Sequence, residues 1–371
     1  MKITKIETLR VSIPFDGGGA AVGMRPGLNP WQKLESLMVR IETEDGLVGW
    51  GEGFGHFVNA GTETILQTLV GPWFLGKDSR PIVSLMEDAQ RVFFGFGRNG
   101  PVVYALSAID IALWDLAAKR AGQPLFRLLG GQDGQVRLYA SLTRSGGNLD
   151  VLRCNCSRAS EAGFGLIKLH ENTMAAFLAA RESVGQSTLI ALDVNCPWSV
   201  DEARSVAQAI RGKGFHWLEE PVWPPEDFRG LAAVRQEGVS IAGGENIGNL
   251  HDFRSAFEAG AFDVAQPSVT KLGGITVMAR VLALAEAYSV RIVPHNFYWG
   301  PGYLATCHLV ASMPRPALVE TAFVKLERSP YPLFDPTRPT LTIPEAPGLG
   351  FEPDWGVIEA CMVNRNAIGK E

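Results

Sequence analysis

Apolar and polar residues alternate at the start of the chain, as they do in a half-buried strand. Over residues 2–13 the pattern is set by Ile3, Ile6, Leu9, Val11 and Ile13. Two more strands are predicted at residues 37–42 and 47–52, joined by the hairpin signal Glu44-Asp45-Gly46. Helical periodicity follows at residues 60–70, 82–94 and 102–120. The pattern therefore predicts an α+β domain over residues 1–130, with a three-stranded sheet followed by helices.

From residue 136 onward, short apolar runs alternate with helical patterns. Strands are expected near residues 136–141, 166–169, 189–192, 217–218, 239–242, 262–265, 291–293 and 318–319. Helices are expected between them, for example at residues 200–211 and 276–287. Eight strands in this order close most simply as an α/β barrel over residues 131–330, with an open doubly wound sheet as the alternative. The Pro- and Gly-rich tail, residues 331–371, is expected to pack back on the first domain.

Two glycine-rich segments interrupt the first domain. Residues 14–31 contain Gly17-Gly18-Gly19 and three prolines, which predicts a mobile loop, either a surface Ω-loop or a lid over an active site. The second segment runs from Gly51 to His56. It follows a hairpin and does not open a helix, so it is not a dinucleotide-binding fingerprint.

Three acids stand at one even interval, each behind a short apolar run. Asp193, Glu219 and Glu245 are 26 residues apart, a distance that fits one strand, one helix and two loops. They are therefore expected to converge at the C-terminal ends of barrel strands. Three ionised acids in one cleft need a cation, and an all-oxygen set suits Mg²⁺ or Mn²⁺ better than Zn²⁺.

Basic and polar residues are predicted at the same rim. Lys168 and His170 end the second barrel strand on one face and could supply a neutral base near pH 7. His295 ends the seventh strand and Glu320 the eighth. Asn195 could bond a substrate hydroxyl or carboxylate. Two bases on opposite sides of a divalent cation suggest removal of the proton next to a carboxylate, with the cation stabilising the enediolate.

The composition and net charge limit the kinds of partner that the protein is expected to bind. The chain has 371 residues, 46% hydrophobic, 20% charged, and a formal net charge of −5. No basic field attracts nucleic acid or anionic lipid, so a small polar substrate is expected. No signal segment or uninterrupted membrane-spanning run is apparent, which predicts a soluble cytoplasmic protein. The five cysteines form no metal framework and are expected to be reduced.

Seven motifs spread over nearly the whole chain carry a family resemblance. They read Ala108-Ile-Asp-Ile-Ala-Leu-Trp-Asp115, Pro124-Leu-Phe-Arg-Leu-Leu-Gly-Gly131, Leu192-Asp-Val-Asn195, Trp217-Leu-Glu-Glu-Pro221, Gly243-Gly-Glu-Asn246, Lys271-Leu-Gly-Gly274 and Val293-Pro-His295. Together they resemble the enolase superfamily, specifically the mandelate racemase/muconate lactonizing enzyme group.

The resemblance implies a capping domain, formed by both termini, on a modified TIM barrel of (β/α)7β type. It also implies Asp193, Glu219 and Glu245 as Mg²⁺ ligands, Glu320 as the acid that hydrogen-bonds the substrate carboxylate, and a homo-oligomer. The loop before Trp31 and the turn near His56, a substrate-binding candidate, match the specificity lids.

The chain departs from the family pattern at two positions. His170 stands where the mandelate racemase branch has a second Lys, and a neutral imidazole remains a competent base there. Ser268 stands where that branch has the Asp paired with the seventh-strand His, so the sequence shows nothing that holds His295 in one tautomer. The muconate lactonizing branch has a Lys base at this position, so Ser268 also argues against a cycloisomerase or dipeptide epimerase of that type.

These observations predict a Mg²⁺-dependent enzyme that removes the α-proton of a hydroxycarboxylate. The main expectation is dehydration of a sugar acid to a 2-keto-3-deoxy acid, with His170 or His295 taking the proton. The first alternative is a racemase, epimerase or cycloisomerase acting through the same enediolate. The second is a non-catalytic homologue that binds metal and sugar acid.

Overall fold

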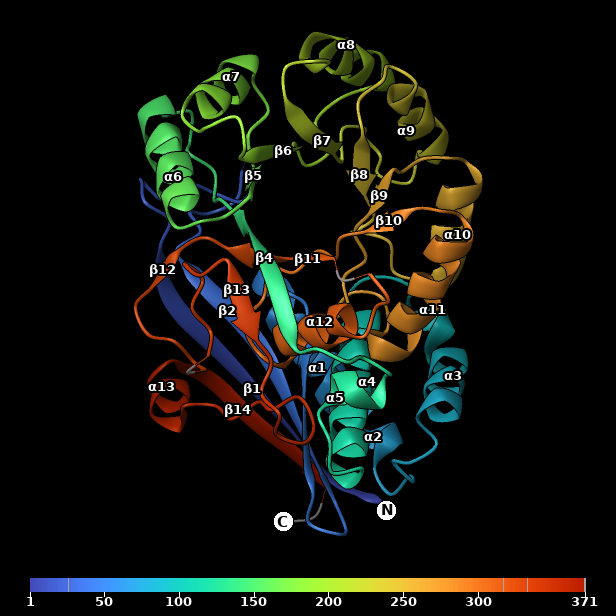
Figure 1. Cartoon of the computed structure of the whole chain (residues 1–371). Helices are drawn as coiled ribbons and strands as arrows, with labels where there is room; N and C mark the ends of the chain where they lie inside the picture. Colours follow the sequence, from blue (N-terminus) through green and yellow to red (C-terminus); the bar gives the residue numbers. More distant parts are fainter. Residues whose placement is uncertain (26, 316, 332, 370–371) are drawn as a thin grey trace.

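The computed structural model describes residues 1–25, 27–315, 317–331 and 333–369 and contains two sheets (Figure 1). One is a mainly N-terminal antiparallel sheet of order β12-β1-β2-β3, in which β14 also pairs with β1. The other is a curled parallel sheet of order β10-β9-β8-β7-β6-β5-β4-β11, extended by the antiparallel strand β13. The mixed α/β fold with a barrel-type sheet confirms the predicted fold class.

The antiparallel sheet is larger than predicted. Its strands β1 (Ile3–Asp16), β2 (Lys33–Thr43) and β3 (Val48–Gly53) were expected, whereas β12 (Lys325–Leu326) and β14 (Met362–Gly369) come from far along the chain. Ile6 of β1 faces Ile368 of β14. The predicted loop at residues 14–31 begins later than expected, because Phe15 and Asp16 pair with β12 and keep β1 extended.

Helices cover one face of the antiparallel sheet. They are α1 (Asn59–Ile65), continued through the π-helical turn Leu66–Val70 into α2 (Gly71–Phe74), then α3 (Ile82–Phe93) and α4 (Pro101–Arg120). Helix α4 lies so close to β3 that a Cβ on Gly51 would collide with the Ala108 carbonyl oxygen. Helix α4 is long and apolar enough to cross a membrane by length and composition alone, but 78% of its most apolar stretch is buried inside the fold, as in the core helix of a soluble domain.

Buried acidic side chains of this helical layer and its sheet form hydrogen bonds to the barrel. Asp110 of α4 accepts the backbone N–H of Thr276 at 3.0 Å, at the start of α11 (Gly274–Ala287). Glu52 of β3 accepts the N–H groups of Gly300 and Gly302, both at 3.0 Å, at the start of α12 (Pro301–Ala311). Free N–H groups at a helix start need such acceptors. The segment after β10 is therefore held by the antiparallel sheet.

The barrel region alternates eight parallel strands with seven helices in the described chain. The strands are β4 (Gln135–Ser141), β5 (Leu166–Leu169), β6 (Leu189–Asp193), β7 (Phe215–Glu219), β8 (Ile241–Gly243), β9 (Val264–Ala265), β10 (Arg291–Ile292) and β11 (Leu318–Ala322). The helices after β4 to β8 are α6 (Leu149–Glu161), α7 (Met174–Glu182), α8 (Val200–Ile210), α9 (Phe228–Arg235) and α10 (Leu250–Glu258), followed by α11 and α12 after β9 and β10. Each predicted strand corresponds to an observed one, with ends that differ by a few residues.

Three short elements complete the fold. Helix α5 (Leu125–Leu128) links the two parts, β13 (Thr340–Thr342) pairs with β4, and α13 (Trp355–Ala360) precedes β14. Figure 1 shows the first strand, β1, and the last described strand, β14, side by side in the antiparallel sheet.

Candidate active site

Side-chain alternation along the barrel strands places the polar candidates. Leu166, Ala191 and Trp217 belong to one apolar cluster inside the barrel. Side chains two residues apart share a face of a strand. Lys168, Asp193 and Glu219 each follow one of these residues by two positions, and therefore lie above the apolar cluster, toward the C-terminal ends of the strands.

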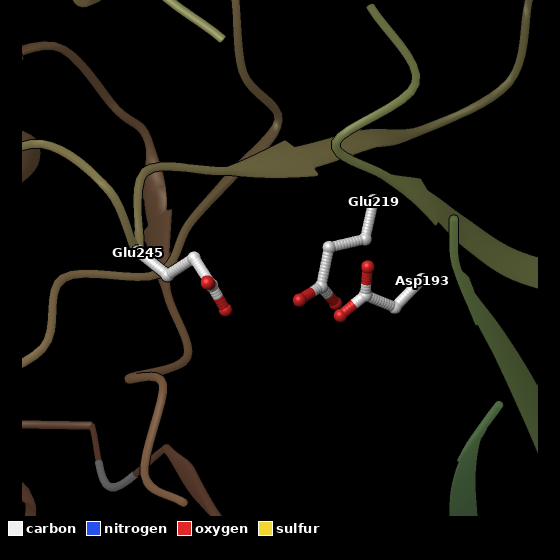
Figure 2. A group of neighbouring side chains, drawn as sticks. All are labelled: Asp193, Glu219 and Glu245. Carbon is white, nitrogen blue, oxygen red and sulfur yellow. The ribbon is translucent and has the colours of Figure 1, made fainter. Parts of the chain in front are cut away.

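Asp193, Glu219 and Glu245 come together at this end. One carboxylate oxygen from each lies within 4.8 Å of the others. Figure 2 shows Asp193 and Glu219 reaching from β6 and β7, and Glu245 from the loop after β8, toward one shared space. Burial raises the pKa of Glu219 well above its usual range, and the charges of Asp193 and Glu320 add to this effect. The cluster therefore needs positive charge.

Lys168 supplies one such charge. Its Nζ lies 3.0 Å from Asp193 Oδ2, 2.6 Å from Glu219 Oε1 and 3.1 Å from Glu320 Oε1. Burial favours the neutral amine, but the attraction of these carboxylates outweighs burial and raises the pKa of Lys168 well above its usual range. In this arrangement three acids hold the Lys168 proton, which does not favour the expected neutral base. The role of Lys168 stays a prediction.

His170 follows Lys168 by two residues and lines the large cavity above the acids. Its Nδ1 lies within hydrogen-bond distance of the Leu142 carbonyl oxygen. A carbonyl only accepts, so Nδ1 carries a proton. In the neutral ring Nε2 is then unprotonated, and it lies 3.4 Å from Asp193 Oδ2. His170 thus presents a basic nitrogen at the acid cluster.

His295 approaches the cluster at a different acid. Its Nε2 lies 3.2 Å from Glu245 Oε2, and its Nδ1 lies 3.2 Å from Ser268 Oγ. The ring is buried, which lowers its pKa. The dyad Asp of the family pattern is thus replaced in space by the Ser268 hydroxyl, and this hydroxyl does contact the ring.

Two predicted residues support other members of the site. Asn195, at φ 54°, donates to Asp193 Oδ1 from its backbone N–H at 3.0 Å and from Nδ2 at 2.9 Å, and it also lines the cavity. Glu320 is fully buried and accepts the Asn296 backbone N–H at 3.0 Å. Asn195 therefore orients Asp193, and Glu320 joins Lys168 to the segment next to His295.

The cavity above the acids measures about 550 Å³. Residues from the glycine-rich stretches 17–25 and 28–32 form part of its wall, and Trp31 packs against Phe297 and His56 with ring centroids 5.1 and 5.3 Å apart. His56 is buried, and neither ring nitrogen has a hydrogen-bond partner among the described residues. Burial lowers the pKa of His56 to about 3, so its imidazole is neutral.

Sequence reasoning gave no role to two residues of the site. Lys271 lines the cavity, with Nζ 2.9 Å from Asn246 Oδ1, 3.4 Å from Glu245 Oε1 and 4.5 Å from the centre of the Phe54 ring. Its place in the Lys271-Leu-Gly-Gly274 motif was the available signal. Tyr298 lies three residues after His295, and its hydroxyl contacts Ser268 at 3.2 Å. No local pattern distinguishes it from other buried tyrosines.

The arrangement combines an all-oxygen cluster, a buried cation and two imidazoles. Such a site can bind a divalent cation and transfer protons at a substrate held above it.

Family models match most of the chain. The mandelate racemase/muconate lactonizing enzyme N-terminal domain matches residues 27–130, and the enolase C-terminal domain-like model matches residues 152–357. The chain is 32% identical to a 3,6-anhydro-alpha-L-galactonate cycloisomerase of Streptomyces coelicolor, over 91% of this chain and 92% of the relative. It is 31% identical to a D-galactarolactone cycloisomerase of Agrobacterium fabrum, over 99% and 98%. An arabinonate dehydratase of Saccharolobus solfataricus is 28% identical over 88% and 90%.

Two solved structures share the fold of this chain over nearly its whole length. A racemase of Streptomyces coelicolor with bound magnesium has a TM-score of 0.86 at 30% identity and covers 97% of this chain and 100% of its own. An L-talarate dehydratase of Polaromonas, complexed with magnesium and L-glucarate, has a TM-score of 0.81 at 26% identity, covering 100% and 99%. The relatives are enzymes, named as dehydratases and cycloisomerases, and both of these structures contain magnesium.

Proposed function

Because this chain belongs to the mandelate racemase/muconate lactonizing enzyme family of the enolase superfamily, we propose that it removes the proton α to the carboxylate of a sugar acid. The principal reaction is dehydration to a 2-keto-3-deoxy acid. The observation that carries the proposal is the meeting of Asp193, Glu219 and Glu245 within 4.8 Å, with a histidine Nε2 beside two of them.

Mg²⁺ is the cofactor that fits this donor set. All three ligands are carboxylates, and hard divalent cations prefer oxygen. Lys168 offsets part of the negative charge, and Asn195 fixes the Asp193 carboxylate by two hydrogen bonds. Mg²⁺ bound here supplies positive charge that stabilises the charge developing on the substrate carboxylate.

The histidines are proposed to transfer the protons. His170 presents an unprotonated Nε2 and takes the α-proton, and the β-hydroxyl then leaves. His295, or a nearby acid, gives that hydroxyl a proton so that it departs as water. The resulting enol becomes the 2-keto acid by taking a proton at the β-carbon. The opposite assignment makes His295 the base, and the proton for the hydroxyl then comes from a nearby acid, because the neutral His170 ring carries its proton on Nδ1.

Lys168 and Glu320 are proposed to hold the acid cluster in place without taking part in proton transfer. Lys168 is fully buried and lies among three carboxylates, so it acts as a fixed cation. Glu320 already accepts the Asn296 N–H and pairs with Lys168. We therefore assign Glu320 to holding this layer together, beside the place where the substrate carboxylate binds.

His56 and the stretches 17–25 and 28–32 are proposed to recognise the rest of the substrate. A neutral imidazole offers one donor and one acceptor, which suits a sugar hydroxyl. The aromatic rings of Trp31 and Phe297, which line the cavity, can cover the C–H face of a sugar.

A second candidate is cycloisomerisation, because two relatives above 30% identity that align with more than 90% of this chain are named cycloisomerases. The chemistry differs in one respect: the β-oxygen that leaves belongs to a ring and stays attached to the product. Racemisation or epimerisation instead returns a proton to the α-carbon.

A screen of sugar acids and cyclic sugar acids with Mg²⁺ in D₂O tests the proposal. Formation of a 2-keto acid with loss of water establishes dehydration, and a 2-keto acid of unchanged mass establishes cycloisomerisation. Deuterium at the α-carbon without keto product indicates a racemase or epimerase. Binding of a sugar acid without exchange or product identifies a non-catalytic homologue and contradicts the proposal.

The setting of the enzyme is also proposed. We place it in the cytoplasm as a homo-oligomer without nucleic-acid or membrane partners, supported by the net charge of −5 and the family resemblance. We divide the chain into a capping domain (1–130), the barrel (131–330) and a C-terminal segment (331–371) that returns to the cap, supported by the β1–β14 pairing. Sedimentation of the purified protein tests the oligomer.

A further inference from the structure

A second cavity opens at the N-terminal end of the barrel, away from the acid cluster. It measures about 1070 Å³, compared with about 550 Å³ for the active-site cavity, and none of the described residues lines both. Its wall combines the N-terminal parts of β4, β10 and β11 with the C-terminal parts of α11 and α12. The chemistry of a barrel lies at the opposite ends of its strands, so the proposed reaction does not use this cavity.

The cavity lies at a seam in the parallel sheet. Strands β10 and β11 are the two ends of the strand order, and no backbone ladder joins them in the described part of the chain. At the active-site end Asn296 bridges the seam, since its backbone N–H donates to Glu320 Oε2 at 3.0 Å and its Nδ2 to the Glu320 carbonyl oxygen at 2.9 Å. At the other end, Arg291 and Leu318, the first residues of the two strands, line the cavity.

Three arginines line this cavity: Arg137, Arg291 and Arg315. Arg137 of β4 and Arg291 of β10 each stand two residues before a member of the inward-facing apolar cluster, Tyr139 and Val293 respectively. Side chains two residues apart share a face of a strand. Both arginines therefore point to the inside of the barrel, below the apolar cluster.

In the described part of the chain, none of these arginines forms an ion pair with a carboxylate. Asp263, whose charge acts on Arg291, pairs instead with Arg235 at 2.8 Å. Arg291 Nη2 lies 3.3 Å from His216 Nε2, and a guanidinium only donates, so its charge stays uncompensated there. Glu286 is the one acid among the described lining residues. The wall thus has three positive side chains and one negative, in a chain of formal net charge −5.

Much of the remaining wall is apolar. Trp217, Val293 and Leu318 line the cavity on the side of the barrel interior, and Leu282 and Leu309 line it from α11 and α12. An inorganic ion could satisfy the arginines but would leave this apolar surface facing water. A ligand with an apolar part would cover it and gain the free energy of removing that surface from water.

We propose that this cavity binds a small organic anion made of an apolar body and a carboxylate, phosphate or sulfonate group. Guanidinium groups bind such oxyanions through paired, charge-assisted hydrogen bonds, and Arg137 and Arg291 supply them from two strands. The excess of positive charge favours an anion over a neutral ligand of the same shape. The apolar body packs on the wall formed by Trp217 and the leucines.

The test uses anilinonaphthalene sulfonate, an aromatic anion that fluoresces when bound to apolar surface, and the full-length protein with Mg²⁺. The wild type should bind it saturably. Arg137→Gln and Arg291→Gln should each weaken binding about tenfold. Arg229→Gln is the matched control, because Arg229 on α9 is exposed and does not line the cavity, and it should leave the affinity unchanged.

A further variant separates the cavity from its charge. Ala283 is exposed and lines the cavity, so Ala283→Trp should fill part of the space without changing any charge and should also weaken binding. An unchanged thermal unfolding midpoint shows that each variant is folded.

Two results overturn the proposal. Equal affinity in the wild type, Arg137→Gln and Arg291→Gln would place the bound probe elsewhere. No saturable binding by the wild type would mean that the cavity takes no such anion, as when a second copy of the chain covers it. Both measurements are made without turnover, so they stand whether or not the proposed dehydration is found.

Discussion

The His170 and His295 sides of the site hold the same side chain in different ways. Both rings place Nε2 against a carboxylate of the acid cluster, at 3.4 and 3.2 Å. His170 turns Nδ1 to the Leu142 backbone carbonyl, which can only accept. His295 turns Nδ1 to the Ser268 hydroxyl, which can accept or donate. A backbone acceptor fixes a tautomer by itself, whereas a hydroxyl needs a further partner.

The two rings are alike in the charge of the group behind Nδ1. Neither histidine has a carboxylate behind Nδ1, so neither side stabilises an imidazolium in the way a His–Asp dyad does. The site is therefore built from two rings with neutral supports.

The largest expected effect comes from removing either ring. His170→Asn and His295→Asn should each lower kcat by about 10²–10⁴, the range for general acid–base groups. The variant that lacks the base should also lose exchange of the α-proton in D₂O, and the other should retain exchange while forming little product. His251→Asn, at an exposed position on α10, is the control. Equal exchange in both variants would contradict a division of roles.

Removing the positive charge of Lys168 should reduce the stability of the folded protein. Lys168→Met leaves three buried carboxylates without their partner, and breaking such a pair costs about 3–5 kcal/mol. Because Mg²⁺ would bind two of these acids, Asp193 and Glu219, it should restore much of the loss in thermal or urea unfolding. Lys119→Met removes the partner of buried Asp115, 2.8 Å away and outside the site, and Mg²⁺ should not rescue it. Equal rescue of both variants would show that the effect is not local.

Glu219 and the adjacent Glu220 should differ in their contribution to Mg²⁺ affinity. Glu219→Gln should weaken Mg²⁺ binding at least about 100-fold, since supporting residues alone cost 10–100-fold. Glu220→Gln should have a smaller effect, because Glu220 instead bonds Asn246 at 2.8 Å. Calorimetric titration measures both affinities, and the reverse order would assign the wrong member of the pair.

His308, a histidine outside the site, should have the smallest effect, which is on the pH dependence of stability. His308 accepts the Phe126 N–H at Nδ1 (2.9 Å) and donates from Nε2 to the Leu349 carbonyl (3.1 Å), so neither nitrogen is free for chemistry. Burial lowers its pKa to about 4, below the unfolded value of 6.5. The stability it contributes is complete above pH 6.5 and is lost as pH falls toward 4.

From pH 7.5 to pH 5, this loss amounts to about 2 kcal/mol. Urea unfolding at the two pH values should show a smaller pH effect in His308→Gln than in the wild type. An identical pH effect in both proteins would remove His308 from this role.

Much of the fold and of the acid cluster could be predicted, because the signals were local. Strand alternation placed Asp193 and Glu219 two residues beyond inward-facing apolar residues, and the even spacing of the acids reflected the repeated strand–helix unit. Strands β12 and β14 were missed because their partners are more than 300 residues away in sequence. Tyr298 and the second role of Asn195 were missed because both depend on hydrogen-bond directions that no residue pattern encodes.

A crystal structure with Mg²⁺ and a sugar acid that the enzyme binds tests the site most directly. We expect one ion about 2.1 Å from oxygens of Asp193, Glu219 and Glu245. We also expect the Nε2 atoms of His170 and His295 to face the substrate carbons from opposite sides. An ion bound elsewhere, or both imidazoles on one side of the substrate, would contradict the proposed chemistry.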